Sequence, residues 1–450
     1  MSFDPRRADS RPTNIRWLVF GLGAGTSWML NVHRYAFGMI MPLLTEEYGF
    51  TNEELGWLVA SFQFSYAAFQ FPIGVLADLW SPRILLSMMI LARSTLLALH
   101  AYYPEFRILV WIRGGFGAAQ AGTYAALTPL TRFWFPLGVR TRMQGLMGTT
   151  AGRLGGLSAN FLFATVLIGY LGMGWQKAVY VLAAGGLALG IAFFLLVRDR
   201  PRQHPLIDAH EVRLIERGSP DVYPVRADEA PSEARKPRLS PLALLARLPS
   251  RSIGNVGLLS SAATCSTIAD LVYSVWLPSF LRQVHGLTYA EMGIFASLPL
   301  LGGAIGGAYG GFLNDLILRV TGRRRWARSF VGAGGKTLAG VTLAAALLFY
   351  DRPYVFCGML FVVKFFADWE LASRWGCVTD IGRNAAASLS GFVNTIASVG
   401  GMGAAVMYGY VSENHGWTPV FLIAIGAYAL CATSYLFVNA AMPLLRDERE

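Results

Sequence analysis

Long apolar stretches alternate with short polar segments along most of the chain. A helix of about 20 apolar residues crosses the ~30 Å hydrocarbon core of a membrane. Stretches of that length predict twelve transmembrane helices, at residues 17–44, 55–80, 84–103, 108–135, 145–170, 175–197, 253–281, 292–318, 330–350, 354–379, 385–411 and 417–438. The pattern therefore predicts an all-α membrane protein with six helices in each half.

The two halves of the chain repeat each other. The segment GFTNEELG at 49–56 recurs as GLTYAEMG at 286–293, and GVLAD at 74–78 recurs at the same spacing as GFLND at 311–315. Duplicated halves are typical of secondary transporters, whose substrate site lies between the repeats near the middle of the bilayer. The predicted bundles span residues 17–197 and 252–440, with tails at 1–16 and 441–450. The polar, proline-rich stretch 198–251 predicts a linker that is partly helical around 208–217.

Composition and charge narrow the class of protein. With 54% hydrophobic and only 14% charged residues, the chain has too little polar sequence to cover a soluble fold. The net charge of +11 arises from short arginine-rich loops such as 319–328, whereas the loop 46–54 holds four glutamates. Arginine-rich loops remain in the cytoplasm, so we expect a multi-pass protein of the cell (inner) membrane with both termini cytoplasmic. The basic residues form no continuous stripe, which argues against a nucleic-acid partner.

Residues typical of metal sites and enzymes are absent from the sequence pattern. All four cysteines fall within predicted helices, and none belongs to a CxxC pair. Neither HExxH nor GxSxG occurs, and the six histidines are scattered through both halves. The sequence therefore predicts no metal site, no cofactor and no enzyme activity.

The loop between the second and third predicted helices reads GVLADLWSPR at 74–83. It resembles the signature loop of the major facilitator superfamily, although Leu79 stands where a basic residue is usual and Ser81 where glycine is usual. The resemblance implies two pseudo-symmetric six-helix bundles and a gating role for this loop. The gating residues implied in the two halves are Gly74, Asp78, Arg83 and Asp315.

Further motifs resemble one branch of that superfamily, the anion:cation symporters, which includes bacterial hexuronate, galactonate and glucarate transporters and vertebrate sialin. The motifs are YAAFQFPIG at 66–74, RGGFG at 113–117, RDRP at 198–201, WLPSFL at 276–281, TDIG at 379–382 and SGFVN at 390–394. They extend over nearly the whole chain. The resemblance implies transport of a small organic anion.

Two charged residues fall near the middle of the membrane, at matching depths in the two repeats: Arg34 on the first helix and Asp270 on the seventh. A charge at the bilayer centre costs at least ~2.5 kcal/mol, so each needs a partner or a function. Anion-transporting relatives carry an Asp-Arg pair on the first helix, and its arginine binds a substrate carboxylate. Here the pair reads His33-Arg34, so the resemblance implies that Arg34 binds the anion. The alternative is a permanent Arg34–Asp270 salt bridge between the bundles.

Arg113 on the fourth helix matches the second membrane arginine of these relatives, which implies a second anion ligand. The alternative is that its side chain extends toward the membrane surface near Arg107. Relatives carry proton-coupling acids where this chain has His33 and Gln120. An amide cannot titrate, whereas imidazole titrates near neutral pH, so His33 is a candidate proton carrier.

Four charged residues lie within the predicted tenth helix: Lys364, Asp368, Glu370 and Arg374. A spacing of four residues lets Lys364 pair with Asp368, and Glu370 with Arg374. The alternative interpretation makes Asp368 or Glu370 a proton carrier, or Lys364 a further anion ligand. Polar candidates for the rest of the binding site are Tyr66, Gln70, Gln120, Tyr273 and Asn394.

Arg93, Arg153 and Lys336 are further charged residues within predicted helices. Arg93 and Lys336 lie close in sequence to cytoplasmic arginines, so we expect their side chains to extend to the membrane surface. Arg153 lies deeper, and its sequence position leaves open whether it faces the centre of the protein.

These patterns predict a secondary active or facilitative transporter of a small organic anion, a sugar acid or other carboxylate, by alternating access. We expect a monomer in the lipid bilayer, with protons as the candidate coupling ion. One alternative is efflux of a cationic or amphipathic compound, which Asp270, Asp368 and Glu370 would suit and Arg34 and Arg113 would not. Another alternative is a membrane sensor that does not transport.

Overall fold

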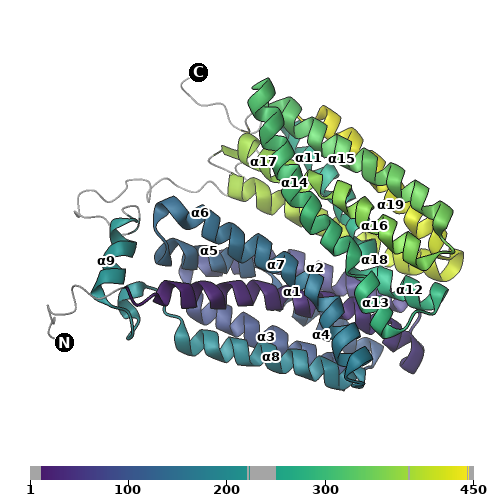
Figure 1. Ribbon diagram of the computed structural model, residues 1–450, viewed down its shortest axis with the longest axis horizontal. Helices are drawn as coiled ribbons and strands as arrows, with labels where there is room; N and C mark the ends of the chain where they lie inside the picture. The colour runs from purple at the N-terminus through teal and green to yellow at the C-terminus, as the bar shows by residue number, and fades with distance from the viewer. Residues whose placement is uncertain (1–11, 220–221, 223–249, 384–385, 443, 445–450) are drawn as a thin grey trace.

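The computed structural model describes residues 12–219, 222, 250–383, 386–442 and 444, and in that part of the chain every regular element is helical (Figure 1). The first half contains α1 (Ile15–Tyr48), α2 (Asn52–Leu79), α3 (Pro82–Tyr102), α4 (Phe106–Gln120), α5 (Thr123–Trp134), α6 (Leu137–Gly145), α7 (Ala151–Asn160) and α8 (Trp175–Leu196). The linker contains α9 (Ala209–Arg217). The second half contains α11 (Ser250–Leu271), α12 (Leu277–His285), α13 (Tyr289–Phe295), α14 (Leu298–Thr321), α15 (Arg324–Ala346), α16 (Pro353–Ala367), α17 (Trp369–Gly382), α18 (Ala386–His415) and α19 (Trp417–Phe437).

Several neighbouring helices continue one another, so the described helices form twelve long segments, six in each half. Eight segments among the described residues are long and apolar enough, by length and composition, to cross a membrane. The predicted all-α membrane fold is confirmed. Two of the joins are π-helical turns, Leu146–Thr150 before α7 and Val272–Trp276 between α11 and α12. Such turns interrupt a helix locally and are frequent at functional sites.

The sequence repeat corresponds to a repeated turn between helices. Gly49 ends α1 and Gly286 ends α12, each with a positive φ, 70° and 62°, that glycine adopts without strain. Thr51 and Thr288 then begin the next helix, and each hydroxyl accepts the backbone N–H of the glutamate three residues later. Each glutamate accepts the threonine N–H in return, which completes a capping box. The duplicated residues therefore specify the same helix-to-helix turn in both bundles.

Hydrogen bonds join the two bundles at the end opposite the termini. The side chains of Asn52 on α2 and Gln283 on α12 exchange hydrogen bonds of 3.2 and 2.9 Å, and the Asn52 N–H donates to Glu413 on α18 at 2.8 Å. Farther along this interface, the Thr165 hydroxyl donates to the Ala290 carbonyl at 2.8 Å. In Figure 1 the ribbons of the two bundles come together at this end and spread apart toward the end with the termini and α9.

At the end opposite the termini, hereafter the closed end, a carboxylate joins the two bundles. Glu46 lies near the end of α1, beyond the predicted span 17–44, and accepts hydrogen bonds from Arg282 on α12 and from the Tyr289 hydroxyl. Burial alone would raise the pKa of Glu46, but the bonds from Arg282 and Tyr289 outweigh burial and hold the pKa below its usual value. The contact therefore depends on an ionised Glu46.

This contact predicts a pH-dependent closed end. A carboxylate whose pKa is lowered by folding stabilises the folded contact above the usual pKa, and this stabilisation is lost as the pH falls through the lowered value. We expect the closed end to be intact at neutral pH and to loosen as the pH falls below the usual carboxyl value of 4.5. Distances between spin labels on α1 and α12 would measure the change. Glu46→Gln should loosen the contact at every pH, whereas Glu53→Gln, at an exposed position of the same turn, should retain the wild-type profile; the wild-type profile in Glu46→Gln would contradict the prediction.

The linker helix α9 caps the start of α1. The carboxylate of Glu211, which is fully buried, accepts the N–H groups of Ile15 and Arg16 at 3.0 Å each and the Thr13 hydroxyl at 2.7 Å. The first N–H groups of a helix have no partner within the helix, and its N-terminus carries partial positive charge, so a carboxylate there is stabilising. The helix predicted around residues 208–217 is present and is fixed against the first bundle.

The signature loop packs against the end of α8 in its own bundle. Asp199 accepts the Ser81 hydroxyl at 2.6 Å and the Arg83 N–H at 2.9 Å, and the Arg83 guanidinium donates to the Phe194 carbonyl at 2.7 Å. Gly74 lies within α2, and Asp315 is exposed on α14. The side chain of Asp78 lies outside the described residues. The gating role of this loop stays a prediction.

Candidate functional site

A cavity of about 470 Å³ lies between the two bundles. Its walls in the first bundle come from α1, α2, α4, α5, α7 and the π-helical turn Leu146–Thr150. Those in the second bundle come from α11, α14, α16, α17 and the π-helical turn Val272–Trp276. The charged residues that line it are Arg34, Arg113, Arg153, Asp270, Lys364, Asp368, Glu370 and Arg374. The fold therefore gathers most of the charges noted within the membrane around one space.

Two arginines form the side of the cavity that belongs to the first bundle. The Arg34 guanidinium lies over the rings of Phe62 and Tyr66, with its carbon 5.0 and 5.2 Å from the ring centroids, and donates to the Gln63 side chain at 3.5 Å. The Arg113 guanidinium lies 3.7 Å from the centroid of Phe37 and 4.8 Å from that of Phe62. Cation–π contacts of this kind hold a guanidinium in place without neutralising it.

Neither arginine has a carboxylate partner among the described residues. Arg113 is only 3% exposed and lines the cavity, so its side chain does not extend to the membrane surface near Arg107. A guanidinium presents parallel N–H groups that fit a carboxylate or sulfonate, and it keeps its charge. This side of the cavity can bind an anionic group.

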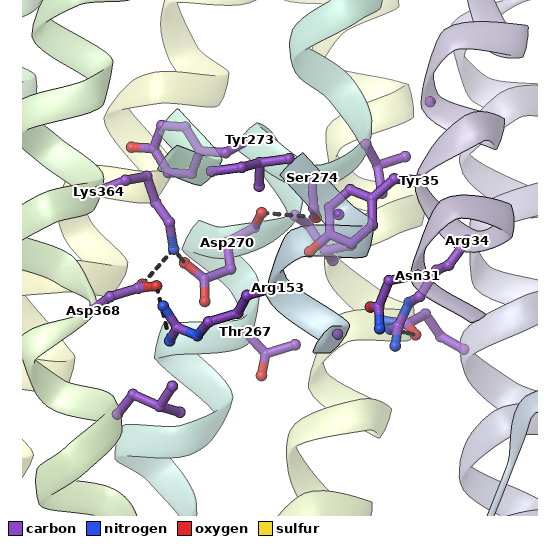
Figure 2. A pocket seen from close by; sticks show the side chains of 18 of the residues that line it. Asn31, Arg34, Tyr35, Arg153, Thr267, Asp270, Tyr273, Ser274, Lys364 and Asp368 are labelled. Carbon is purple, nitrogen blue, oxygen red and sulfur yellow. Dashed lines mark hydrogen bonds and ion pairs between the residues drawn. The ribbon is translucent and has the colours of Figure 1, made fainter. Parts of the chain in front are cut away.

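A linked set of ion pairs forms the opposite side. The Lys364 ammonium lies 2.7 Å from Asp270 and 2.6 Å from Asp368. Arg153 extends from α7 of the first bundle to Asp368, at 3.5 Å, and donates to the Gly303 carbonyl on α14. Figure 2 shows Lys364 between the two aspartates, with Arg34 on the far side of the pocket. Asp270 is thus paired with Lys364 in this structure, and the alternative of an Arg34–Asp270 salt bridge is not found here.

Behind these pairs lies a second, buried polar cluster. Glu370 is 1% exposed and accepts hydrogen bonds from Tyr435 at 2.6 Å and Ser266 at 3.1 Å. Its carboxylate also lies 3.6 Å from Arg374 and 3.8 Å from Lys336. Both predicted pairs on the tenth helix, Lys364–Asp368 and Glu370–Arg374, are present. Glu370 is therefore already satisfied by four neighbours.

Several sequence candidates do not meet in the cavity. His33 is fully buried, with one ring nitrogen 3.0 Å from the Leu182 carbonyl on α8, and it lies outside the cavity lining. Gln120 is 1% exposed, and neither amide atom has a hydrogen-bond partner in the described part of the chain. Gln70 and Asn394 also lie outside the lining. Tyr273 lines the cavity, and Tyr66 lies behind it, stacked on Phe62 and beneath Arg34.

Sequence reasoning did not assign Arg153, which lines the cavity, or Lys336, which lies behind Glu370, to this site. Lys336 is fully buried and donates to Ser266 at 2.8 Å, so the expectation that it extends to the membrane surface is wrong. The same expectation is wrong for Arg93, which is fully buried and donates to the Thr26 carbonyl. Arg153 crosses between the bundles because α14 has no side chain at Gly307, where a Cβ would lie 2.8 Å from its guanidinium. The glycines of α14, which leave space for the Arg153 side chain, were the sequence feature that could have predicted this contact.

No group of three or more histidine, cysteine or acidic side chains in the described ranges is arranged to hold a metal ion. The site instead consists of cations, carboxylates and aromatic rings between two six-helix bundles.

Residues 23–405 match the family model described as Major Facilitator Superfamily. The chain belongs to the major facilitator superfamily. This family consists of membrane transporters and not enzymes, so the chain is a non-enzymatic, multi-pass membrane transporter.

Curated relatives confirm the resemblance to organic-acid transporters. A probable sulfoacetate transporter of Cupriavidus necator is 28% identical over 96% of this chain and 94% of its own length. A probable galactarate/D-glucarate transporter of Bacillus subtilis is 26% identical over 95% of this chain and 92% of its own length. Among solved structures, a bacterial homologue of the human lysosomal transporter Spinster, in an inward-facing and unoccupied conformation, covers 95% of both chains with a TM-score of 0.70 at 15% identity. That structural likeness supports the fold alone.

Proposed function

We propose that this transporter carries a small organic anion by alternating access, and that Arg34 and Arg113 bind the anion in the central cavity. The observation that carries the proposal is the pair of guanidinium groups that line the cavity with no carboxylate partner among the described residues. Uncompensated charge at this depth is costly, and a bound anion would compensate it. The similar transporters named for sulfoacetate and for galactarate and D-glucarate support the same substrate class.

Efflux of a cation has less support. Each carboxylate that lines the cavity already has a cationic partner, since Asp270 and Asp368 share Lys364 and Glu370 lies beside Arg374. A cationic substrate would have to displace these partners and would meet two arginines that have no carboxylate partner in the described part of the chain. A sensor without transport would leave the two arginines without a ligand.

The proposal also covers the orientation of the protein in the membrane and its oligomeric state. The arginine-rich loops favour a cytoplasmic location for both termini in the inner membrane. In that orientation the closed end, with Glu46 and Arg282, faces outward, and the bundles diverge toward the cytoplasm. The cavity is built from one chain, so we propose that a monomer is sufficient for transport.

Uptake into proteoliposomes tests the proposal. We expect the wild-type protein to take up labelled sulfoacetate or D-glucarate, and we expect Arg113→Gln to lose this uptake because one anion ligand is removed. Arg107→Gln is the matched control, since Arg107 is exposed near the start of the same helix. Uptake of a lipophilic cation, together with no uptake of any organic acid, would reject the anion proposal and favour efflux.

Energy coupling can be tested in the same vesicles. For a proton carrier we propose Asp270 or Asp368, because both face the cavity and share one ammonium group. His33 lies outside the lining, and Glu370, although it lines the cavity, is 1% exposed and already contacts four polar neighbours. An imposed pH gradient should drive accumulation in wild type and in His33→Gln but not in Asp270→Asn combined with Asp368→Asn. No gradient-driven accumulation in wild type would favour facilitated diffusion or exchange.

A further inference from the structure

The charges around the cavity do not balance. Five cationic side chains and three carboxylates line it, which leaves a formal excess of two positive charges. Lys336, which lies behind Glu370 and outside the lining, adds positive charge and no negative charge. The excess around the cavity is therefore at least two positive charges.

The excess is concentrated on one wall. Arg153, Lys364 and Arg374 each have a carboxylate within 4 Å, at 3.5, 2.6 and 3.6 Å. Arg34 and Arg113 have none among the described residues, and aromatic rings and single weak hydrogen bonds to Gln63 and a backbone carbonyl surround them. One carboxylate can neutralise only one of these two guanidinium groups. The second would stay uncompensated when the bundles close around the ligand.

The two guanidinium groups are close enough for one small molecule. Both lie against the same Phe62 ring, with their carbons 5.0 and 4.8 Å from its centroid. A short carbon chain with an acid group at each end can therefore contact both. The cavity of about 470 Å³ leaves room for such a chain and for water.

We propose that the transported anion is a small dianion with two separate acid groups, carboxylate or sulfonate, one for Arg34 and one for Arg113. This inference rests on the proposed function and narrows its substrate class from organic anions in general. Charge matching gives the selectivity, because a monoanion leaves a buried guanidinium unpaired while a dianion leaves neither. A single doubly charged phosphate group is the competing chemistry, since it could occupy both arginines from one point.

Matched ligands of the same shape test the charge requirement. Binding to the purified full-length protein would be measured by calorimetry at neutral pH and constant ionic strength, because salt screens such interactions. Succinate is compared with succinamate, and sulfoacetate with its amide, so that each pair differs by one charge. We expect the dianion of each pair to bind at least about tenfold more tightly to wild type, equivalent to one extra charge-assisted contact. Inorganic phosphate is expected to bind no better than the monoanions.

The arginine variants complete the test. In Arg34→Gln and Arg113→Gln the preference for the dianion should fall to about twofold or less, because only one guanidinium remains, while monoanion affinity changes little. Arg107→Gln should keep the wild-type preference. Equal binding of both members of each pair to wild type, an unchanged preference in both variants, or tight phosphate binding would overturn the dianion proposal. If organic anions of either charge bind and are lost in the variants, the proposed function stands and only this inference fails; if none binds, the proposed function fails.

Discussion

Replacing Arg34 with lysine is expected to weaken anion binding by at least about tenfold while the protein still folds and inserts into the membrane. Lysine retains the charge but loses the planar group of donors and the stacking on Phe62 and Tyr66. Arg34→Gln should lose more, because it also removes the charge. Calorimetry with sulfoacetate would measure the affinity, and the melting temperature of the purified protein would report folding.

The control for this prediction is Arg107→Lys, at an exposed position of α4. It should bind as wild type does. An affinity in Arg34→Lys and Arg34→Gln equal to that of wild type would remove Arg34 from the binding site. A lowered melting temperature with unchanged affinity would assign Arg34 a structural role only.

The largest effect on stability is expected from Lys364→Met. The Lys364 side chain is 7% exposed, and its ammonium is the closest cation to both Asp270 and Asp368, so its loss leaves two carboxylates without their main partner. Removing one member of a buried ion pair typically costs about 3–5 kcal/mol, and we expect the lower end of that range because Asp270 is partly exposed to the cavity. A clearly lower melting temperature in detergent would be the readout.

A compensating variant distinguishes the effect of unpaired charge from the effect of lost packing around Lys364, Asp270 and Asp368. Adding Asp270→Asn and Asp368→Asn to Lys364→Met removes the unpaired carboxylates, so we expect part of the lost stability to return. Recovery would identify uncompensated charge as the cause. A melting temperature that is unchanged in Lys364→Met, or that falls further in the triple variant, would disprove this account of the cluster.

The position of a residue along its helix could be predicted from the sequence, but the direction in which its side chain points could not. Arg34 could be placed near the bilayer centre by counting, and it does line the cavity. His33 lies at the same depth, yet successive residues on an α-helix point about 100° apart, and His33 faces α8 instead. Local pairs were also predictable, because Lys364 and Asp368 lie one turn apart on the same element.

Contacts between elements that lie far apart in the sequence could not be predicted from it. The Lys364–Asp270 pair depends on how α16 and α11 are rotated toward each other, and the Arg153–Asp368 pair depends on the space left by glycines on α14. Gln120 was a sequence candidate for the binding site, yet it lies outside the cavity lining. It is the last residue of α4, and Gly122, with φ 73°, redirects the chain into α5 directly after it.

In the transport cycle that we propose, Arg34 and Arg113 also affect the return of the carrier without anion. When the empty carrier changes the side to which its cavity opens, the bundles must close around two guanidinium groups that hold no anion and lose part of their water. The loaded carrier passes through the same closure with those charges neutralised. We therefore expect the return of the carrier without anion to be the slow step. Unlabelled anion on the opposite side of the membrane should then speed the release of labelled anion from loaded vesicles. In the proposed cycle, two arginines that have no carboxylate partner among the described residues therefore favour exchange of anions over net movement in one direction.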